Sequence, residues 1–225
     1  MAEELGLWAE VSYQLSWLGR VALLTGRLAE ARELHEHAAR MAVEHGFTPG
    51  RIYADTGLAL GARRAGDLDV AEGHLQTLLA WHRAVDVESG SALVLAELGF
   101  VAELRGDAAA SMELQLDGFA VARRVGDPRA LALAMEGLAG ALALAGEPHR
   151  AARLLGAAAA ARESVGAPLP PAERGDIERI AAAARLAIGE PAFASELERG
   201  PALAPDELVR PDAGPAGTRP VKQAG

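Results

Sequence analysis

The sequence contains no cysteine and few aromatic residues, and it has no long apolar run. Without cysteine, disulfide scaffolds, thiolate metal sites, thiol nucleophiles and thiol redox switches are excluded. No apolar run approaches the roughly 18 residues of a membrane-spanning helix, and the acidic start MAEELGLWAE lacks the basic region of a signal peptide. We therefore expect a cytoplasmic protein without a membrane partner.

Positive charge is also scarce. The 225 residues include 22 Lys plus Arg against 31 Asp plus Glu, which gives a net charge of −9. Such a surface repels phosphate backbones, so direct binding of nucleic acid would require a local basic patch. The two candidates, Arg63 with Arg64 and Arg123 with Arg124, stand in the last turns of predicted helices, where cations stabilise the helix dipole. We expect no direct binding of nucleic acid.

Half of the residues are apolar, enough for a sizeable core, and four glycines at intervals of 40 residues reveal an internal repeat. They are Gly26, Gly66, Gly106 and Gly146. Each follows an apolar run of helical period, and a small residue stands five positions later. Glycine just past a helix end supplies a left-handed C-cap, so each of these glycines marks a turn between two helices. Because no run alternates as a strand does, the pattern predicts an all-α solenoid of four helical hairpins.

The repeat resembles the tetratricopeptide (TPR) repeat. Leu15-x-x-Leu18-Gly19 matches its Leu-Gly positions, and the string from Leu95 to Gly99 matches them again. The aromatic positions of the family do not carry over, and the unit is 40 residues long instead of about 34. The resemblance therefore implies a TPR-like solenoid whose helices are about 17 residues long.

The repeat stops after residue 166, where three prolines precede another amphipathic segment, 172–188. We expect this segment to be a C-terminal capping helix, with Ile177, Ile180, Ala184 and Ile188 against the last repeat. Its polar residues are then expected to face solvent: Glu173, Arg174, Asp176, Glu178, Arg179 and Arg185. This divides the chain into a solenoid with its cap (1–188), a short helical extension (189–210) and a disordered tail or linker (211–225).

The last third of the chain carries a narrower resemblance. The run RAARLLGAAAAARESVGAPLPPAER and the later IGEPAF are similar to the end of the helical regions in large actinobacterial transcriptional regulators, of the SARP type and of the large LuxR type with an ATPase module. The sequence contains neither a G-x-x-x-x-G-K-[ST] phosphate loop nor a basic recognition helix. The resemblance implies an interaction or sensor region whose partner modules lie elsewhere.

Histidines are the residues that could indicate an enzyme or a metal site. His35-Glu36-His37 falls short of H-E-x-x-H because Ala39 takes the place of the second ligand, and residues two apart lie on different sides of a helix. No nucleophile elbow or paired-carboxylate signature is present. We predict no catalytic residue, no cofactor and no metal, although a site assembled from distant helices leaves no local motif.

The first helices of the four units predict a binding groove, because these helices line the concave face in TPR proteins. Aligned positions give the candidate partner-binding residues Tyr13, Arg20, Tyr53, Arg63, Phe100, Glu103 and Glu136. Tyrosine offers an apolar face with a hydroxyl, and arginine offers a bidentate fork for carboxylate or phosphate. The first two units therefore suit an anionic peptide or a small acidic ligand. In the alternative interpretation, these side chains fill the gaps between helices.

The predicted function is binding of a protein, peptide or ligand, as the interaction or sensor region of a transcriptional regulator. A stand-alone adaptor and a helical-repeat metabolite-binding protein or enzyme are alternatives. A large open apolar groove favours the adaptor, whereas a deep pocket with converging His, Arg and Tyr favours the metabolite-binding protein or enzyme. The sequence leaves open the identity of the ligand, whether the chain forms a homo-oligomer, and whether it is a fragment of a larger regulator.

Overall fold

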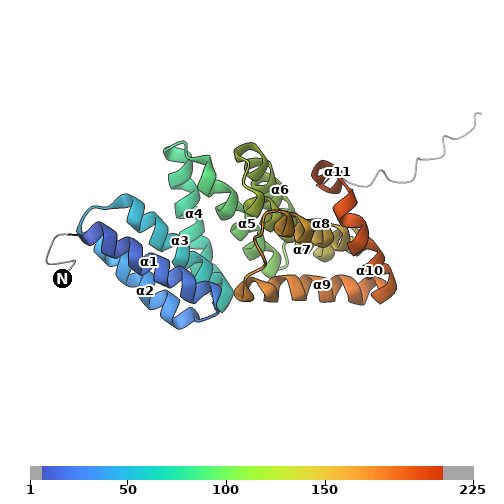
Figure 1. Cartoon of the computed structure of the whole chain (residues 1–225), viewed down its shortest axis with the longest axis horizontal. Coiled ribbons are helices and arrows are strands. Elements are labelled where there is room, and N and C mark those ends of the chain that lie inside the picture. The colour runs from blue at the N-terminus through green and yellow to red at the C-terminus, as the bar shows by residue number, and fades with distance from the viewer. Residues whose placement is uncertain (1–6, 210–225) are drawn as a thin grey trace, which may run out of the picture.

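The computed structural model describes residues 7–209, and within them every regular element is helical. Four antiparallel hairpins follow one another along the chain (Figure 1). They pair α1 (Trp8–Leu24) with α2 (Leu28–Glu44), α3 (Thr48–Ala65) with α4 (Leu68–Ala84), α5 (Glu88–Leu104) with α6 (Ala108–Val125), and α7 (Pro128–Leu144) with α8 (Pro148–Ser164). The predicted all-α helical-repeat solenoid is confirmed. No helix in the described range is long and apolar enough to cross a membrane.

The turns inside the hairpins form where the repeated glycines predict them. Gly66 ends α3 with a φ of 87°, and Gly106 follows α5 with a φ of 84°. These left-handed conformations are strained for residues with a Cβ, which is why glycine recurs at this position. The carboxylate of Asp107 then accepts a hydrogen bond from the amide of Ala110 at 2.9 Å and caps α6.

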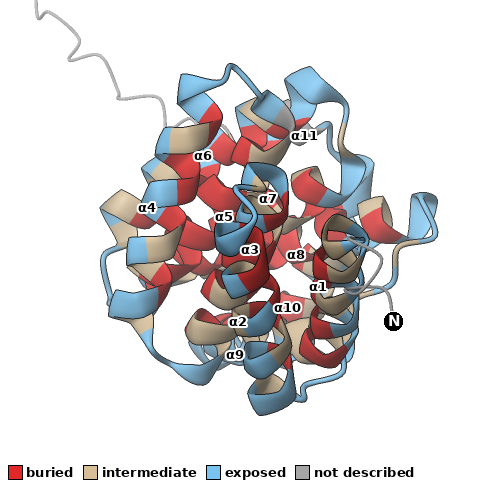
Figure 2. Cartoon of the chain, turned by 90° about the vertical axis from the view of Figure 1, so that its left-hand side faces the viewer, coloured by how far each residue is buried: buried red, intermediate tan, exposed pale blue. Residues whose placement is uncertain are grey.

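Side chains from the second helices fill the space between consecutive first helices. His35 of α2 packs against both Gly19 of α1 and Gly57 of α3, and a Cβ on Gly57 would lie only 2.1 Å from its Nε2 atom. Gln115 of α6 sits between two further glycines in the same way. Leu75 and Leu155 hold the equivalent buried positions of the second and fourth hairpins. Figure 2 shows the resulting concentration of buried residues on the inward sides of the helices.

The C-terminal elements are η1 (Pro171–Glu173), α9 (Arg174–Ile188), α10 (Glu190–Arg199), η2 (Gly200–Ala202) and α11 (Pro205–Val209). The elements α10 and η2 pack directly on α8: a Cβ on Gly156 would lie 2.0 Å from the carbonyl oxygen of Leu197, and one on Gly200 would lie 2.0 Å from that of Arg153. The short helical extension thus takes part in closing the array. The predicted tail, 211–225, lies outside the described residues.

Helix α9 lies across the side of the array that the first helices α1, α3, α5 and α7 line, which we call the inner face (Figure 1). Its apolar side is buried as predicted, because Ile180 and Ala184 have almost no exposed surface. The expectation that its polar residues face solvent is wrong for Glu173 and Asp176, whereas Arg179 is exposed. All three form ion pairs with residues of the hairpins, because the inner face presents groups of opposite charge to them.

Candidate ligand-binding pocket

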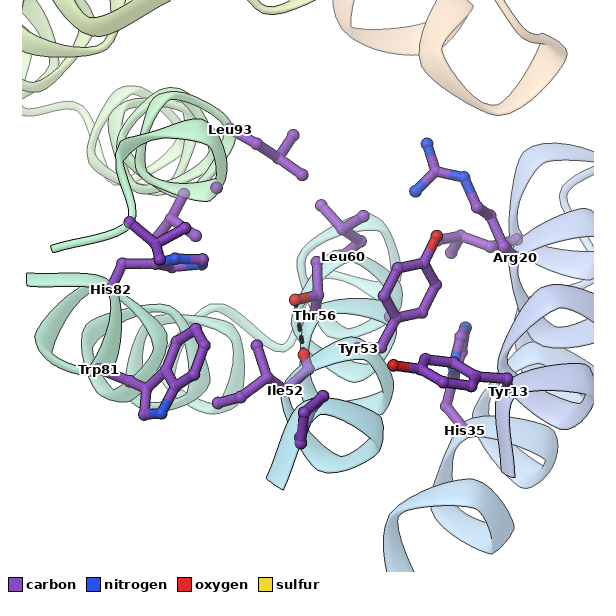
Figure 3. A pocket seen from close by; sticks show the side chains of 16 residues that line it. Tyr13, Arg20, His35, Ile52, Tyr53, Thr56, Leu60, Trp81, His82 and Leu93 are labelled. Carbon is purple, nitrogen blue, oxygen red and sulfur yellow. Dashed lines mark hydrogen bonds between the residues drawn. The ribbon is translucent and has the colours of Figure 1, made fainter. Parts of the chain in front are cut away.

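A pocket of about 400 Å³ opens between the first two hairpins and α5. Figure 3 shows its walls, with Tyr13 and Arg20 on one side and with Trp81 and His82 opposite them. We call it the N-terminal pocket. Its lining residues are Tyr13, Arg20, Leu23, His35, Pro49, Ile52, Tyr53, Thr56, Gly57, Leu60, Trp81, His82, Val87, Gly90, Leu93 and Val94. The lining is mainly aliphatic and aromatic, as is usual for small-molecule sites.

The two tyrosines of the pocket are held by contacts between rings. Tyr13 of α1 and Tyr53 of α3 lie edge to face, with centroids 6.2 Å apart and an interplanar angle of 83°. Phe47 packs edge to face on Tyr13 at 5.2 Å, and Trp17 packs on Tyr53 at 5.8 Å. Such contacts are favourable beyond the area that they bury. Neighbouring aromatic rings therefore support both tyrosine rings on this side of the pocket.

Arg20 is the one charged side chain among the residues that line the N-terminal pocket. It is partly buried, and no carboxylate of the described chain forms an ion pair with it. Burial and the nearby Arg20 lower the pKa of His35 to about 4, and burial also lowers the pKa of His82. Both imidazoles are consequently neutral at pH 7, so the pocket carries a single positive charge.

His35 forms part of the pocket wall in an unusual environment. It is 1% exposed, and neither ring nitrogen has a hydrogen-bond partner within the described structure. A buried donor without a partner costs about 1–3 kcal/mol, and a protonated ring would cost more. The glycines on either side give the ring its space, since a Cβ on Gly19 would lie 2.7 Å from Nε2. The ring is therefore a neutral packing element between α1 and α3.

The structure brings together three of the seven predicted groove residues, namely Tyr13, Arg20 and Tyr53. The other four are buried along the inner face, outside this pocket: Arg63, Phe100, Glu103 and Glu136. These four side chains fill the gaps between helices, as the alternative interpretation of the sequence has it.

Ion pairs account for the burial of three of these four residues. Arg63 donates to Glu97 of α5 and, at 2.8 Å, to Asp176 of α9. Arg179 of α9 donates to Glu103 at 2.7 Å. Glu136 accepts two hydrogen bonds from Arg162 of α8, at 2.5 and 2.7 Å. The C-terminal half of the predicted groove is thus filled from within the chain.

Phe100, the fourth of these residues, contacts Arg63. The guanidinium carbon of Arg63 is 4.9 Å from the centroid of its ring, a cation–π contact. Phe100 is 1% exposed, so its ring packs inside the protein.

Among the aromatic and imidazole side chains that line the pocket, three were not sequence candidates: His35, Trp81 and His82. The sequence indicated His35 only as part of the incomplete H-E-x-x-H motif and placed neither Trp81 nor His82 in a site. The repeat alignment held one signal, because His35 occupies the position at which the second and fourth units have leucine. That signal marks an unusual packing site, although it does not reveal a pocket.

The pair His35 and His37 points in two directions, as its spacing predicts. His35 is buried beside the pocket, whereas His37 is exposed to solvent. Across residues 7–209, no group of three or more His, Asp or Glu side chains is arranged to hold a metal ion.

No protein-family model and no curated protein matches the chain. The similarity of its last third to large actinobacterial regulators therefore stays a prediction.

Proposed function

We propose that this chain is a ligand-binding helical-repeat module and that the N-terminal pocket holds the ligand. The observation that carries the proposal is a recessed cavity of about 400 Å³ whose mainly apolar walls include one arginine and two tyrosines. Cavities of roughly 300–1,000 Å³ with few polar groups are typical of small-molecule sites. This arrangement favours metabolite binding over an adaptor with an open apolar groove.

The filled half of the inner face supports a small ligand over a long peptide. A peptide lying along all four first helices would have to displace α9, whose Asp176 and Arg179 pair with Arg63 and Glu103. The N-terminal pocket needs no such displacement. A small molecule, or a single group of a larger partner, therefore fits the available space.

Within the same proposal, the module is the sensor region of a cytoplasmic regulator, with its output carried by other modules. The similarity of the last third of the chain to such regulators and the lack of cysteine support this role. The pocket lining contains no carboxylate and no serine or cysteine, so binding is proposed and catalysis is not.

The test is binding of an uncharged environment-sensitive dye, N-phenyl-1-naphthylamine, to the full chain. We expect one dye per chain. Thr56→Trp, which places a large ring at the floor of the pocket, should weaken binding at least tenfold because it removes the available volume (Figure 3). Dye binding that is unchanged in this variant would contradict the proposal.

Thr77→Trp is the matched control. Thr77 lies on the exposed side of α4, and its hydroxyl donates to the carbonyl four residues earlier at 2.9 Å, just as that of Thr56 does at 2.8 Å. Both variants lose the same local hydrogen bond, but only Thr56→Trp fills the pocket. Thr77→Trp should therefore bind the dye as the unchanged protein does.

A further inference from the structure

The electrostatic situation of Arg20 differs from that of other arginines on the same face. Arg63, Arg162 and Arg179 are each paired with one or more carboxylates. Arg20 is partly buried beside apolar side chains and forms no such pair within residues 7–209. Its planar guanidinium offers a fork of N–H donors that matches a carboxylate in two parallel hydrogen bonds. Arg20 is thus prepared for an anionic group that this part of the chain does not supply.

The charge of the pocket limits the charge of its ligand. Arg20 contributes one positive charge, the other lining residues include no Asp, Glu or Lys, and both imidazoles are neutral at pH 7. A cation would be repelled by Arg20, and a dianion would leave one charge unpaired against apolar walls. A monoanion is matched charge for charge.

The remaining walls define the body of the ligand. Leu60, Leu93 and Val94 supply aliphatic surface, and Tyr53 and Trp81 supply aromatic surface on opposite sides. Figure 3 shows the hydroxyl of Tyr53 directed to the side of the pocket on which Arg20 lies. Arg20 and the hydroxyl of Tyr53 therefore form a polar side of the pocket, and most of the other lining residues are apolar.

We propose that the ligand of the N-terminal pocket is a monocarboxylate with an apolar body, whose carboxylate pairs with Arg20 and whose body lies between Tyr53 and Trp81. This inference rests on the proposed function, namely that the pocket binds a ligand at all. It assigns Arg20 as the residue that selects a carboxylate over a neutral or cationic group.

The test compares three probes with the same ten-carbon body: decanoate, decan-1-ol and decylamine. Each is titrated against the bound uncharged dye at pH 7.5 and low ionic strength. Decanoate should displace the dye at a concentration at least tenfold lower than decan-1-ol, and decylamine should be the weakest. Added salt should reduce the advantage of decanoate, because an ion pair open to solvent is screened.

Substitution of Arg20 separates its role from that of the cavity. Arg20→Gln should weaken decanoate at least tenfold more than it weakens decan-1-ol, whereas Arg20→Lys, which keeps the charge without the fork, should retain part of the preference. Arg27→Gln is the control, because Arg27 is exposed and pairs with Glu30 outside the pocket. It should leave all three probes unchanged.

The outcomes distinguish the two proposals. If the unchanged protein does not bind the dye in the pocket, the proposed function fails. If the dye binds but decanoate and decan-1-ol displace it equally, the inference about the ligand is wrong and the proposed function stands. A decanoate preference that survives Arg20→Gln would also overturn the assignment of Arg20.

Discussion

Arg63 of α3 donates to the carboxylate of Asp176 of α9 at 2.8 Å, across 113 positions of the chain. The Arg63 side chain is 2% exposed, and Glu97 of α5 accepts a second hydrogen bond from it. This contact, together with that between Arg179 and Glu103, places α9 against the inner face. It explains why only the N-terminal part of the predicted groove is open.

Arg63→Ala should destabilise the protein by about 3–5 kcal/mol, because it leaves the buried carboxylate of Glu97 without its arginine and removes one of the two arginines that pair with Asp176. As one of the predicted groove residues, Arg63 was expected to bind the partner. Its burial reverses that expectation. Urea unfolding followed by circular dichroism measures the loss.

Arg124→Ala is the comparison for that experiment. Arg124 pairs with Glu88 at 2.7 Å, and both side chains are about half exposed to water. Exposed pairs contribute about 0–1 kcal/mol, so this variant should unfold almost as the unchanged protein does. Equal losses in the two variants would show that the ion pairs around Arg63 do not stabilise the inner face.

The free energy of unfolding should decrease as the pH falls from about 6.5 toward 4. Burial, with Arg20, lowers the pKa of His35 in the folded protein to about 4, whereas an unfolded chain has the ordinary value of about 6.5. The unfolded state therefore binds the proton first, and acid favours unfolding. Between pH 7.5 and 5 this group alone should reduce stability by about 2 kcal/mol.

His35→Gln isolates this effect with a residue that the repeat already uses. Gln115 lies two units later in the same position, between Gly99 and Gly137, where its amide donates to the carbonyl of Ala96 at 2.8 Å. Glutamine should therefore fit, and the variant should lose less stability than the unchanged protein between pH 7.5 and 5. If the two pH profiles coincide, another group controls them.

Gly57→Ala should destabilise the protein by about 1–3 kcal/mol, because its Cβ would lie 2.1 Å from the Nε2 atom of the enclosed His35 ring. Gly73→Ala should instead stabilise it by about 1 kcal/mol. Gly73 is exposed on α4, a Cβ there would meet no atom within 4 Å beyond the backbone of its own helix, and alanine favours helix more than glycine does. Thermal unfolding of the two variants should shift in opposite directions. A shift in the same direction would contradict the close packing around His35.

Deletion of 167–225 should cause aggregation, whereas deletion of 211–225 should leave the melting temperature unchanged. The longer deletion removes α9 and α10, uncovers Leu154 of the last hairpin, and leaves Arg63 and Glu103 without their partners on α9. Size-exclusion chromatography and thermal unfolding measure both effects. Destabilisation by the short deletion would show that the last 15 residues are packed.

Local signals were sufficient to predict the hairpins. Helical periodicity and the glycine caps act within one or two turns, so Gly66 and Gly106 indicated the helix ends correctly. Whether the groove is open depends on contacts between residues far apart in the sequence. The residues next to Arg63 and Glu103 in the sequence do not indicate that α9 will cover these two side chains. For the same reason Tyr13, Arg20 and Tyr53 could be grouped by repeat alignment, whereas the pocket wall formed by Trp81 and His82 could not.

The contact of α9 with the second hairpin also constrains the order in which the chain can fold during its synthesis. In a simple array each hairpin contacts only its neighbours, so it can fold soon after it leaves the ribosome. Here Arg63 and Arg64 gain Asp176 and Glu173 as partners only after more than one hundred further residues have been made. The early hairpins are thus completed by a helix that emerges more than one hundred residues later. We expect the two ends of the array to become native together, as one cooperative unit, instead of one repeat at a time.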